Sequence, residues 1–596
     1  MSVEKLIVDH METWTSALQT RSTAGRGSSG KIDLYGIKKL RELILELAVR
    51  GKLVPQDPND EPASELLKRI AAEKAELVKQ GKIKKQKPLP EISEEEKPFE
   101  LPQGWEWVRL GNIAEYIQRG KGPKYSENGT VRVVSQKCVQ WSGFKLEQSR
   151  WITDESIPSY TEERFLKNGD VLWNSTGAGG TAGRVNFLET VKERLVVDSH
   201  VTIIRSIKQN GQFICNYIST YGIQQLFDPK HPKTLLSGTT NQAELNTSVV
   251  ISFITPFPPQ KEQERINTKV IELMSLCDQL EQQSLTSLDA HQQLVETLLG
   301  TLTDSQNAEE LAENWARISE HFDTLFTTEA SVDALKQTIL QLAVMGKLVP
   351  QDPNDEPASE LLKRIAQEKA QLVKEGTIKK QKPLPPISDE DKPFELPDGW
   401  EWTNLPNLSA NFQNGLSSRG SNVGEDTIVI RLADIQNWRI SYEDTRALKI
   451  TKEMKEKYSM SVNDILIIRV NGSSDIVGRF ILNKEQQQSC FCDHFIKMNF
   501  LCKNAIDCEY LTIISGSPLI RKKIENLFIT TAGQKTVNQT HISSLAIPLP
   551  PIKEQIKIVK KINELFGLIE ALKASIKTAQ QTQLHLADAL TDAAIS

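Results

Sequence analysis

A long internal repeat constrains this chain of 596 residues more than any other feature of its sequence. Segment 51–107 recurs at 346–402 with a constant offset of 295 residues, and only eight of the 57 positions differ. The motif PPQKEQ at 258–263 likewise has a counterpart, PPIKEQ, at 550–555. Self-similarity over such lengths indicates two copies of one structural module. We therefore expect a tandem duplication, with units at about 31–304 and 327–596.

The same order of segments is expected in each unit: a short helix, a near-identical charged segment, a divergent domain, a Pro-Pro turn and a long helix. Apolar residues at Leu66, Leu67 and Ile70 recur at helical spacing within 63–80. Residues 84–102 are charged and rich in proline, which favours an extended connector. The predicted segments are an N-terminal helix and flexible tether (1–30), an N-terminal repeat segment (31–104), a first divergent domain (105–259), a central long helix (260–304), a linker with the second repeat segment (305–399), a second divergent domain (400–551) and a C-terminal long helix (552–596).

Both long helices carry heptads. Core positions alternate in steps of four and three from Ile266 to Leu298, and again from Ile558 to Leu590. The Pro-Pro pairs prevent either helix from starting earlier, and Gly300 is a plausible stop for the first. The seam of the first helix becomes polar at Ser284, Ser287 and His291. We expect the two helices to pair as an antiparallel coiled coil with an internal pseudo-two-fold axis, holding the divergent domains apart; packing of each helix on its own domain is the alternative.

The divergent domains are predicted to mix strands and helices. Apolar runs typical of strands lie at 131–136, 170–175 and 200–206 in the first domain, and at 427–434, 464–470 and 495–501 in the second. Helical stretches at 215–227 and 510–524 accompany them. The expected fold class is therefore α+β multidomain, with two mixed α/β domains and two long antiparallel helices.

Three polar loops lie between the strands of each domain, at 117–124, 174–184 and 237–242 and at 412–420, 469–479 and 532–539. They are rich in Arg, Lys, Gln, Asn, Ser and Thr, the side chains that hydrogen-bond phosphates and base edges. Polar surface turns are the alternative interpretation. The candidate DNA-binding residues are Gln118, Arg119, Lys121, Lys124, Ser135, Gln136, Ser175, Arg184, Thr240 and Asn241, then Ser417, Ser418, Arg419, Arg431, Asp434, Arg469, Asn471, Arg479, Lys535 and Asn538.

Motifs for catalysis or cofactor binding are weak in this sequence. GAGGTA at 177–182 lacks the strand–turn–helix context of a dinucleotide site, and the P-loop pattern GxxxxGK[ST] does not occur. Cys490, Cys492, Cys502 and Cys508 lie near His494 without the usual spacing of zinc ligands. His200 and His494 are expected to be structural, hydrogen-bonded histidines. We therefore predict no catalytic residues, no bound metal and no bound cofactor.

Composition narrows the class of protein further. Lys and Arg (72) nearly balance Asp and Glu (77), so the chain as a whole lacks a basic nucleic-acid footprint. Seven cysteines, an odd and small number, suit a reducing compartment. No apolar run is long enough to span a bilayer. These features predict a cytoplasmic protein without a membrane partner.

The arrangement of these segments resembles the specificity subunit of type I restriction-modification systems. The resemblance covers almost the whole chain and rests on the two Pro-Pro-x-x-Glu-Gln motifs (Pro258, Pro259, Glu262, Gln263 and Pro550, Pro551, Glu554, Gln555), each leading into a heptad helix. The duplicated GKLVPQDPNDEPASELL is similar to the subgroup often called type IB.

That resemblance implies a non-catalytic subunit in which each divergent domain is a target recognition domain reading one half of a bipartite, asymmetric DNA site. It implies that the helices set the spacer and dock two modification (methyltransferase) subunits, joined by two restriction/translocase subunits. S-adenosylmethionine, ATP and Mg²⁺ are then expected on those partners. An autonomous DNA methyltransferase and a coiled-coil adaptor that does not bind DNA are the alternatives.

Overall fold

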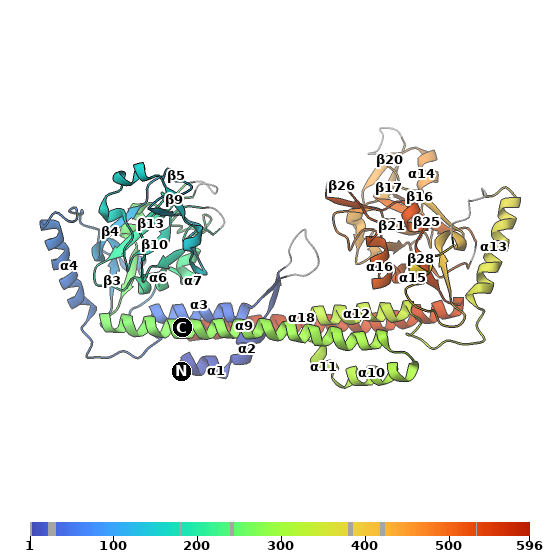
Figure 1. Cartoon of the computed structure of the whole chain (residues 1–596), viewed down its shortest axis with the longest axis horizontal. Helices are drawn as coiled ribbons and strands as arrows, with labels where there is room; N and C mark the ends of the chain where they lie inside the picture. Colours follow the sequence, from blue (N-terminus) through green and yellow to red (C-terminus); the bar gives the residue numbers. More distant parts are fainter. Residues whose placement is uncertain are drawn as a thin grey trace. The chain divides into compact units, whose positions relative to one another are not determined.

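The computed structural model describes residues 3–21, 31–177, 180–238, 243–378, 386–417, 424–502, 504–531 and 533–595. The chain forms two compact units, each of which contains one divergent domain (Figure 1). The first unit comprises Met1–Gln19, Asp33–Leu285 and Gln580–Ser596, and the second comprises Thr20–Ile32 and Thr286–Ala579. Among the described residues, no helix is both long enough and apolar enough to cross a membrane.

The divergent domain of the first unit is built on two four-stranded sheets. The antiparallel sheet has the order β11 (Val185–Phe187), β10 (Val171–Asn174), β13 (Val201–Ser206), β4 (Ala114–Arg119). The mixed sheet has the order β12 (Leu195–Val197), β6 (Arg132–Val134), β9 (Arg150–Ile152), β5 (Tyr125–Ser126), with β12 and β6 parallel. A separate strand pair joins β3 (Glu106–Arg109) to β14 (Ile254–Phe257), and a hairpin joins β7 (Val139–Gln140) to β8 (Gly143–Phe144).

The second unit repeats this topology. Its antiparallel sheet has the order β23 (Phe480–Leu482), β21 (Ile465–Ile468), β25 (Phe495–Phe500), β16 (Ala410–Asn414). Its mixed sheet is β24 (Cys490–Phe491), β17 (Glu425–Ile430), β20 (Ala447–Ile450), with β24 and β17 parallel. The pair β15 (Glu401–Asn404) with β28 (Ala546–Leu549) and the hairpin β18 (Ile435–Gln436) with β19 (Arg439–Ile440) also recur. A further sheet has the order β22 (Val470–Asn471), β27 (Gln534–Thr536), β26 (Ile529–Thr531).

The central strand of each antiparallel sheet is buried on both faces. In β10, Val171 and Trp173 pack with the helical side of the domain, whereas Leu172 packs with the second sheet. In β21, Ile465 and Ile467 face one core cluster, whereas Leu466 and Ile468 face the other. Because successive side chains of a strand point to opposite faces, a strand covered on both sides needs a continuous apolar run. The runs VLW and ILII form strands, as the sequence predicted, and the structure places both strands inside their sheets.

Each helical stretch expected in the divergent domains is two helices. They are α6 (Gly211–Ile218) with α7 (Tyr221–Gln225), and α15 (Cys508–Ile514) with α16 (Pro518–Glu525). The helical stretches expected at 215–227 and 510–524 are thus helical but interrupted. Thr220 and Ser517 are extended N-caps, and Pro518 cannot continue a preceding helix because it lacks an amide hydrogen. Shorter helices are α5 (Leu110–Ile113), α8 (Thr247–Ser252), α14 (Lys452–Tyr458) and α17 (Gln539–Ser543), and 3₁₀ turns span Leu146–Gln148, Asp154–Ser159, Glu162–Arg164, Leu405–Leu408 and Leu432–Asp434.

The repeat segments form matched helices. These are α3 (Tyr35–Val49) and α4 (Ala63–Lys79) in the first unit and α12 (Glu329–Val344) and α13 (Ala358–Lys374) in the second. The helix predicted at 63–80 is thus present in both copies. In the first connector, the only regular element among described residues is a 3₁₀ turn at Glu94–Glu96, and its counterpart is Asp389–Asp391. Elements outside the duplicated order are α1 (Val3–Asp9), α2 (Met11–Ser16), β1 (Gln19–Arg21), β2 (Lys31–Asp33), α10 (Ala308–Glu320) and α11 (Phe322–Leu325); the predicted tether at 22–30 lies outside the described residues.

The long helices are α9 (Gln260–Asp304) and α18 (Ile552–Ile595), and each begins directly after its Pro-Pro pair. The first unit contains the start of α9 and the end of α18, whereas the second contains the end of α9 and the start of α18. This opposite order within each unit agrees with an antiparallel arrangement. Gly300 lies inside α9, so the expected stop there was wrong; an interior glycine costs a helix only about 1 kcal/mol relative to alanine.

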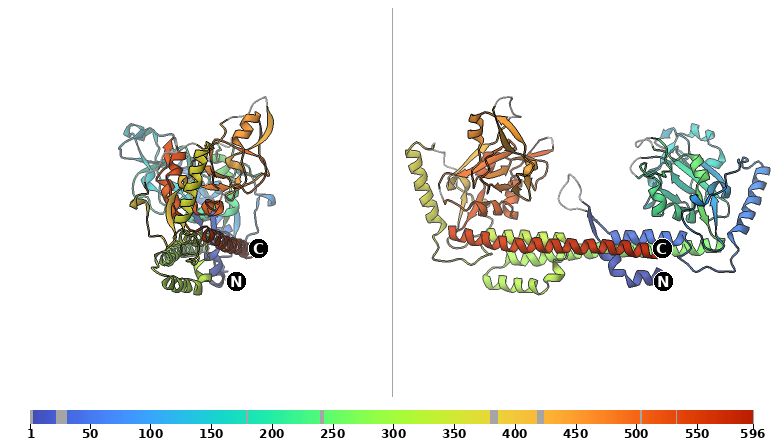
Figure 2. Two further views of the ribbon diagram at one scale, coloured as in Figure 1. Left: turned by 90° about the vertical axis from the view of Figure 1, so that its right-hand side faces the viewer. Right: turned by 180° about the vertical axis from the view of Figure 1, so that it is seen from behind.

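A third helix joins the long helices in each unit, which the heptad pattern did not predict. In the first unit α3 contacts both long helices: Tyr35 Oη donates to Asp588 Oδ1 (2.7 Å), and Arg41 Nη2 donates to Asp278 Oδ1 (2.7 Å). In the second unit Leu335 and Ile339 of α12 share a core cluster with Leu299 of α9 and Ile569 of α18. Figures 1 and 2 show α3 and α12 lying along the long helices.

The heptad positions hold only for the first part of each long helix. In α9, the next buried apolar residue after Leu280 is Val295, fifteen residues later. The expected core residue Leu294 is instead 51% exposed. Burial in α18 steps by eleven residues from Ile576 to Ala587, and the expected Leu586 is 45% exposed. Steps of eleven and fifteen residues are heptad patterns with four-residue stutters, which shift the buried face of the helix. The polar seam is not a buried core, because Ser287 is exposed and His291 Nε2 bonds Thr324 O beside α11 (3.1 Å).

Candidate nucleic-acid interface

The three polar loops of the first divergent domain meet at one place. Ser175 N donates to His200 O (2.8 Å), and Leu245 N donates to Ser175 O (2.7 Å). Glu244 forms a β-bridge with Thr176 and accepts a hydrogen bond from Arg119 Nη1 (3.1 Å). Residues from the ends of β4 and β10 and from the segment after residue 242 are therefore neighbours.

The second divergent domain joins its loops in the same way. Arg469 N donates to His494 O (2.7 Å), and Val537 N donates to Arg469 O (3.0 Å). Asn471 of β22 is paired with Lys535 of β27, so two candidate residues lie side by side. Arg469 thus occupies the position that Ser175 holds in the first domain. We call these two surfaces the three-loop surfaces; they comprise the described residues of 117–124, 174–177, 180–184, 237–238 and 243–245 in the first domain and of 412–417, 469–479 and 533–539 in the second.

Two matched glycines allow the first loop of each three-loop surface to approach the mixed sheet. A Cβ at Gly120 would lie 2.1 Å from the carbonyl oxygen of Val197, and one at Gly415 would lie 2.0 Å from that of Cys492. Real Cβ atoms do not approach oxygen so closely, so only glycine fits here without movement of the backbone. The glycines explain why the motifs Gln-x-Gly at 118–120 and 413–415 persist between otherwise different domains.

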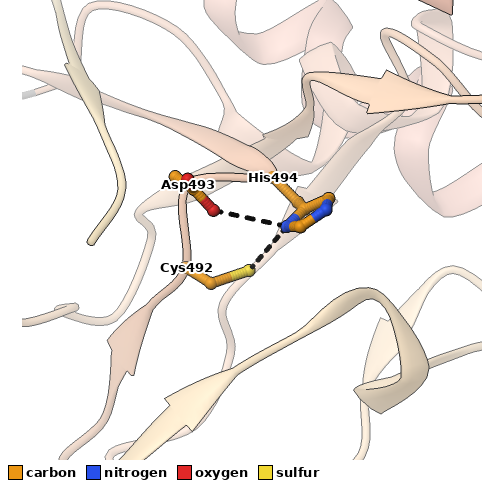
Figure 3. Close-up of side chains that lie close together, drawn as sticks. All are labelled: Cys492, Asp493 and His494. Atoms are coloured by element: carbon orange, nitrogen blue, oxygen red, sulfur yellow. Dashed lines mark hydrogen bonds and ion pairs between the residues drawn. The ribbon is translucent and has the colours of Figure 1, made fainter. Parts of the chain in front are cut away.

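The histidines behave as structural residues, as the sequence predicted for them. His200 Nδ1 bonds Thr176 Oγ1 (2.6 Å), and the His200 amide donates to Asp198 Oδ1 (2.9 Å). Burial raises the pKa of the Asp198 carboxyl. His494 Nδ1 lies 3.6 Å from Cys492 Sγ and 3.4 Å from Asp493 Oδ1, all within the turn between β24 and β25 (Figure 3).

Cys492, Asp493 and His494 are also the only group of three potential metal ligands found among the described residues. Three donors from consecutive residues are fewer than the four that close a structural zinc site. Cys490 and Cys502 are buried elsewhere, and burial raises the pKa of both thiols, which opposes the thiolate form that binds metal. The four cysteines singled out in the sequence therefore do not gather into one site.

The candidate residues differ widely in exposure. Exposed ones are Gln118, Lys121, Lys124, Ser417 and Asn538, and partly buried ones are Arg119, Ser135, Gln136, Arg184, Arg431, Arg469, Asn471, Arg479 and Lys535. Thr240, Asn241, Ser418 and Arg419 lie outside the described residues. Exposed candidates thus remain in both domains.

Two candidates are wrong because they are buried. Ser175 has no exposed surface, and its hydroxyl is hydrogen-bonded to Thr202 Oγ1 inside the sheet. Asp434 is 4% exposed, and its carboxylate accepts hydrogen bonds from Arg431 N (2.7 Å) and Arg431 Nη2 (2.9 Å). Neither side chain can reach DNA without unfolding its surroundings, so Asp434 orients Arg431 rather than contacting a base.

Sequence reasoning missed several residues at the edge of the three-loop surfaces. Glu244 holds Arg119, and Arg184 is hydrogen-bonded to Gln140 of the β7–β8 hairpin. Trp141 and Trp438, at the tips of the β7–β8 and β18–β19 hairpins, are 53% and 47% exposed. Aligning the copies at an offset of 296 places Val139-Gln140 on Ile435-Gln436, which would have revealed the hairpins.

A buried hydrogen-bond network ties each divergent domain to the first turn of its long helix. Glu262 Oε2 accepts from Trp105 Nε1 and Glu554 Oε2 from Trp400 Nε1, both at 3.0 Å. Gln263 Oε1 accepts from Asn210 N (3.0 Å) and Gln555 Oε1 from Asp507 N (2.8 Å). We call Trp105, Glu262 and Gln263, with their counterparts Trp400, Glu554 and Gln555, the Glu-Gln joints. All four Glu and Gln side chains are buried, so the Pro-Pro-x-x-Glu-Gln motif is structural.

Comparison with known proteins places this architecture in a family. The model of the type I restriction modification DNA specificity domain matches residues 102–290 and 416–580. The type I restriction enzyme EcoAI specificity subunit of Escherichia coli is 53% identical over 612 aligned residues and the EcoEI specificity subunit of the same species is 49% identical over 610, each covering 100% of both chains. Among solved structures, the HsdS subunit from Thermoanaerobacter tengcongensis is 16% identical and covers 84% of this chain and 98% of that chain, with a TM-score of 0.40.

These relatives are named as specificity subunits, which confirms the prediction of a non-catalytic subunit and gives no support to an autonomous methyltransferase or an adaptor that does not bind DNA. The full-length identity and the two matches of the DNA specificity domain together carry the assignment. The chain belongs to the family of specificity subunits of type I restriction-modification systems.

Proposed function

We propose that this chain selects a bipartite, asymmetric DNA sequence for a type I restriction-modification complex, and that each divergent domain is a target recognition domain for one half. The observation that supports this most directly is the duplicated three-loop surface. The backbone contacts at His200 and His494 are the same, whereas the side chains presented, such as Ser175 and Arg469, differ. The same scaffold with different polar side chains favours two different half-sites.

The near-identical repeat segments support a pair of identical partners. Exposed residues of α4 and α13 that are not needed for packing, such as Glu65 with Glu360 and Lys68 with Lys363, are the same in both copies. Two equal surfaces on one chain suit two copies of one subunit. We assign these partners as two modification subunits, with two restriction/translocase subunits completing the complex. S-adenosylmethionine, ATP and Mg²⁺ belong on those subunits, and DNA as the target places the complex in the cytoplasm.

The experiment that tests this proposal is selection of methylated sites. The chain is reconstituted with its modification subunits and S-adenosylmethionine, and methylated fragments are sequenced from a random duplex pool. The proposal predicts two fixed half-sequences separated by a gap of constant length. Methylation without sequence preference, or at one uninterrupted sequence, would contradict it.

One variant sharpens this test. Arg431→Ala removes the guanidinium that Asp434 orients, and a bidentate contact with a base is worth about 1–3 kcal/mol. If Arg431 reads a guanine, the variant relaxes the preference at one position of one half-site only. Equal loss of binding on every sequence would instead identify Arg431 as a phosphate contact.

A further inference from the structure

Each divergent domain carries a two-residue hairpin with an exposed tryptophan at its tip. In β7–β8 the residue Gln140 pairs with Gly143, which leaves Trp141 and Ser142 as the turn. In β18–β19 the residue Gln436 pairs with Arg439, which leaves Asn437 and Trp438 as the turn. The indoles are 53% and 47% exposed. The tryptophan is thus present at both tips although the two turns differ in sequence.

Trp438 occupies a backbone conformation that a large side chain rarely adopts. The φ angles of Asn437 and Trp438 are 49° and 60°, those of a type I′ turn. Asn suits the first position and Gly the second, because a Cβ there crowds the backbone. In β7–β8 the positive φ of 100° falls on Gly143 instead. A strained, exposed tryptophan reduces both stability and solubility, which points to a function outside the fold.

The hairpins are held firmly at their bases. Asn186 of β11 donates to Gln140 O (3.0 Å) and accepts from Gln140 N (3.2 Å), and Asn174 Nδ2 donates to Val139 O (3.2 Å). At the base of β18–β19, Ile435 and Ile440 pack against the core cluster that contains Leu466 of β21 and Ile481 of β23. Each indole is therefore presented by a positioned hairpin.

Both tips adjoin the three-loop surfaces through matched arginines. Arg184 is hydrogen-bonded to the Gln140 side chain, and the Arg479 guanidinium lies 4.7 Å from the centre of the Trp438 ring. Lys137 and Arg439, on or beside the same hairpins, are exposed. An aromatic tip bordered by cations suits DNA, because the phosphates carry negative charge and the bases present flat faces on which an indole can stack.

We propose that the hairpins β7–β8 and β18–β19 are additional DNA-contacting elements, and that Trp141 and Trp438 pack against bases of the half-site read by their own domain. The inference rests on the proposed function. An indole inserted against a base step partly unstacks it, and this contact depends on how easily the step deforms rather than on base edges. It would add affinity and shape readout to the polar contacts of the three-loop surface.

The test uses the reconstituted complex with its modification subunits and a duplex carrying the selected site. Thymines in and beside each half-site are replaced one at a time by 5-iodouracil, and ultraviolet crosslinks are mapped by mass spectrometry. We expect Trp141 to crosslink in one half-site and Trp438 in the other. Trp438→Ala should weaken binding of the site by about 5- to 150-fold, the range measured for one base–aromatic stack.

Three controls make the result decisive. Trp315→Ala removes an indole that is 39% exposed on α10, outside both divergent domains, and should leave DNA affinity unchanged. Trp438→Gly should keep or raise the melting temperature, because glycine adopts a φ of 60° without strain, and should still lose affinity. In the Trp141→Ala variant, only base substitutions in the half-site read by the first divergent domain should change in their effect on DNA affinity.

The outcomes separate this inference from the proposed function. Unchanged affinity of Trp141→Ala and Trp438→Ala, with no crosslink at either indole, overturns the inference while the wild-type complex still selects its site. Loss of assembly with the modification subunits at unchanged DNA affinity of the assembled fraction overturns it in favour of a protein-docking role. Failure of the wild-type complex to select any sequence overturns the proposed function itself.

Discussion

Residues that are the same at matched positions of the two divergent domains stabilise the local backbone in the same way in both. Asp170 Oδ2 accepts from Lys167 N, and Asp464 Oδ2 accepts from Ser461 N, both at 2.8 Å, in equivalent turns before β10 and β21. Gly120 and Gly415 permit an equivalent close approach of backbones. The side chains that differ, such as Ser175 and Arg469, lie in the loops between these fixed points. The shared residues thus stabilise the fold, whereas the residues that differ are the candidates for contacting bases.

The glycines give a residue-scale prediction. Gly120→Ala and Gly415→Ala should each destabilise the protein by about 1–3 kcal/mol, because the added Cβ would overlap the backbone carbonyl of Val197 in β12 or of Cys492 just after β24. Thermal unfolding measures the loss. Gly122→Ala is the matched control, since a Cβ there has no neighbour within 4 Å. Equal melting temperatures for Gly120→Ala and Gly122→Ala would show that the strand moves freely.

Single-residue exposure was the part of the interface that the sequence predicted least well. Loop composition indicated polar segments that recur in both domains, yet it could not distinguish exposed Gln118 from buried Ser175, because both belong to polar runs at strand ends. The Ser175 side chain is buried because its hydroxyl is hydrogen-bonded to Thr202 Oγ1 of the neighbouring strand β13. Trp141 and Trp438 were overlooked because an apolar residue in a polar loop is usually assigned to the core.

At the scale of elements, the Glu-Gln joints connect each domain proposed to read DNA with the long helix proposed to set the gap between half-sites. Each joint connects the tryptophan directly before β3 or β15 to the first turn of α9 or α18 through a buried tryptophan–carboxylate hydrogen bond. Because the bond is buried on both copies, it restricts rotation of the domain about the helix start more than an exposed contact would. We expect the joints to determine how strictly the gap between half-sites is enforced.

Removing the indole donors tests this expectation. Trp105→Phe with Trp400→Phe should cost about 1–3 kcal/mol per joint, because each removes the indole donor from a buried carboxyl; Glu554 then keeps only the hydrogen bond from Gln351 Nε2 (3.2 Å). Selected sites should keep both half-sequences but tolerate more gap lengths. Trp107→Phe is the control on the same strand, since that indole packs on Phe99 (5.1 Å between ring centres) rather than on α9. An unchanged gap in the double variant would limit the joints to a purely stabilising role.

The joints also predict a pH dependence. Burial raises the pKa of the Glu262 and Glu554 carboxyls above that of a free glutamate, about 4.3. The folded state then binds more protons than the unfolded state, so stability falls as the pH rises from the unfolded pKa through the raised folded pKa. Glu262→Gln with Glu554→Gln keeps an acceptor for each indole but removes this loss. Its melting temperature relative to wild type should rise as the pH rises above the pKa of a free glutamate; a constant difference would contradict the account.

The heptad pattern predicted only part of how the long helices pack. The Pro-Pro pairs correctly indicated where both long helices start, and the heptads correctly indicated two helices in antiparallel order, although the stop expected at Gly300 was wrong. They could not reveal α3 and α12 as packing partners, because a heptad states only that one face is buried. The register change after Leu280 and Ile576 follows from those extra partners and from the helix period of 3.6 residues, which drifts against a repeat of seven.

For the whole molecule, the duplication means that one chain supplies two reading domains with one topology. Both long helices pass from one unit into the other, α9 after Leu285 and α18 after Ala579. The proposed spacing function therefore depends on the length of these two helices. The near-identical repeat at 51–107 and 346–402 made this architecture the most predictable property of the sequence.

Helix length can be changed directly. Four helix-forming residues inserted after Leu285, with four more after Ala579, lengthen both helices by about 6 Å. If the helices set the spacer, the gap between half-sites should grow by about one or two base pairs, since B-DNA rises about 3.4 Å per pair. Both half-sequences should stay the same. An unchanged gap in the selected sites would contradict the spacing function.

Exchange of one divergent domain tests the central claim most directly. Residues 400–551 are replaced by the corresponding domain of the EcoEI specificity subunit, and methylated sites of the reconstituted complex are sequenced. The account predicts a hybrid site in which one half-sequence and the gap length are unchanged and the other half-sequence is new. A change in both half-sequences, or in neither, from a complex that still methylates DNA would contradict the claim that each domain reads its half independently.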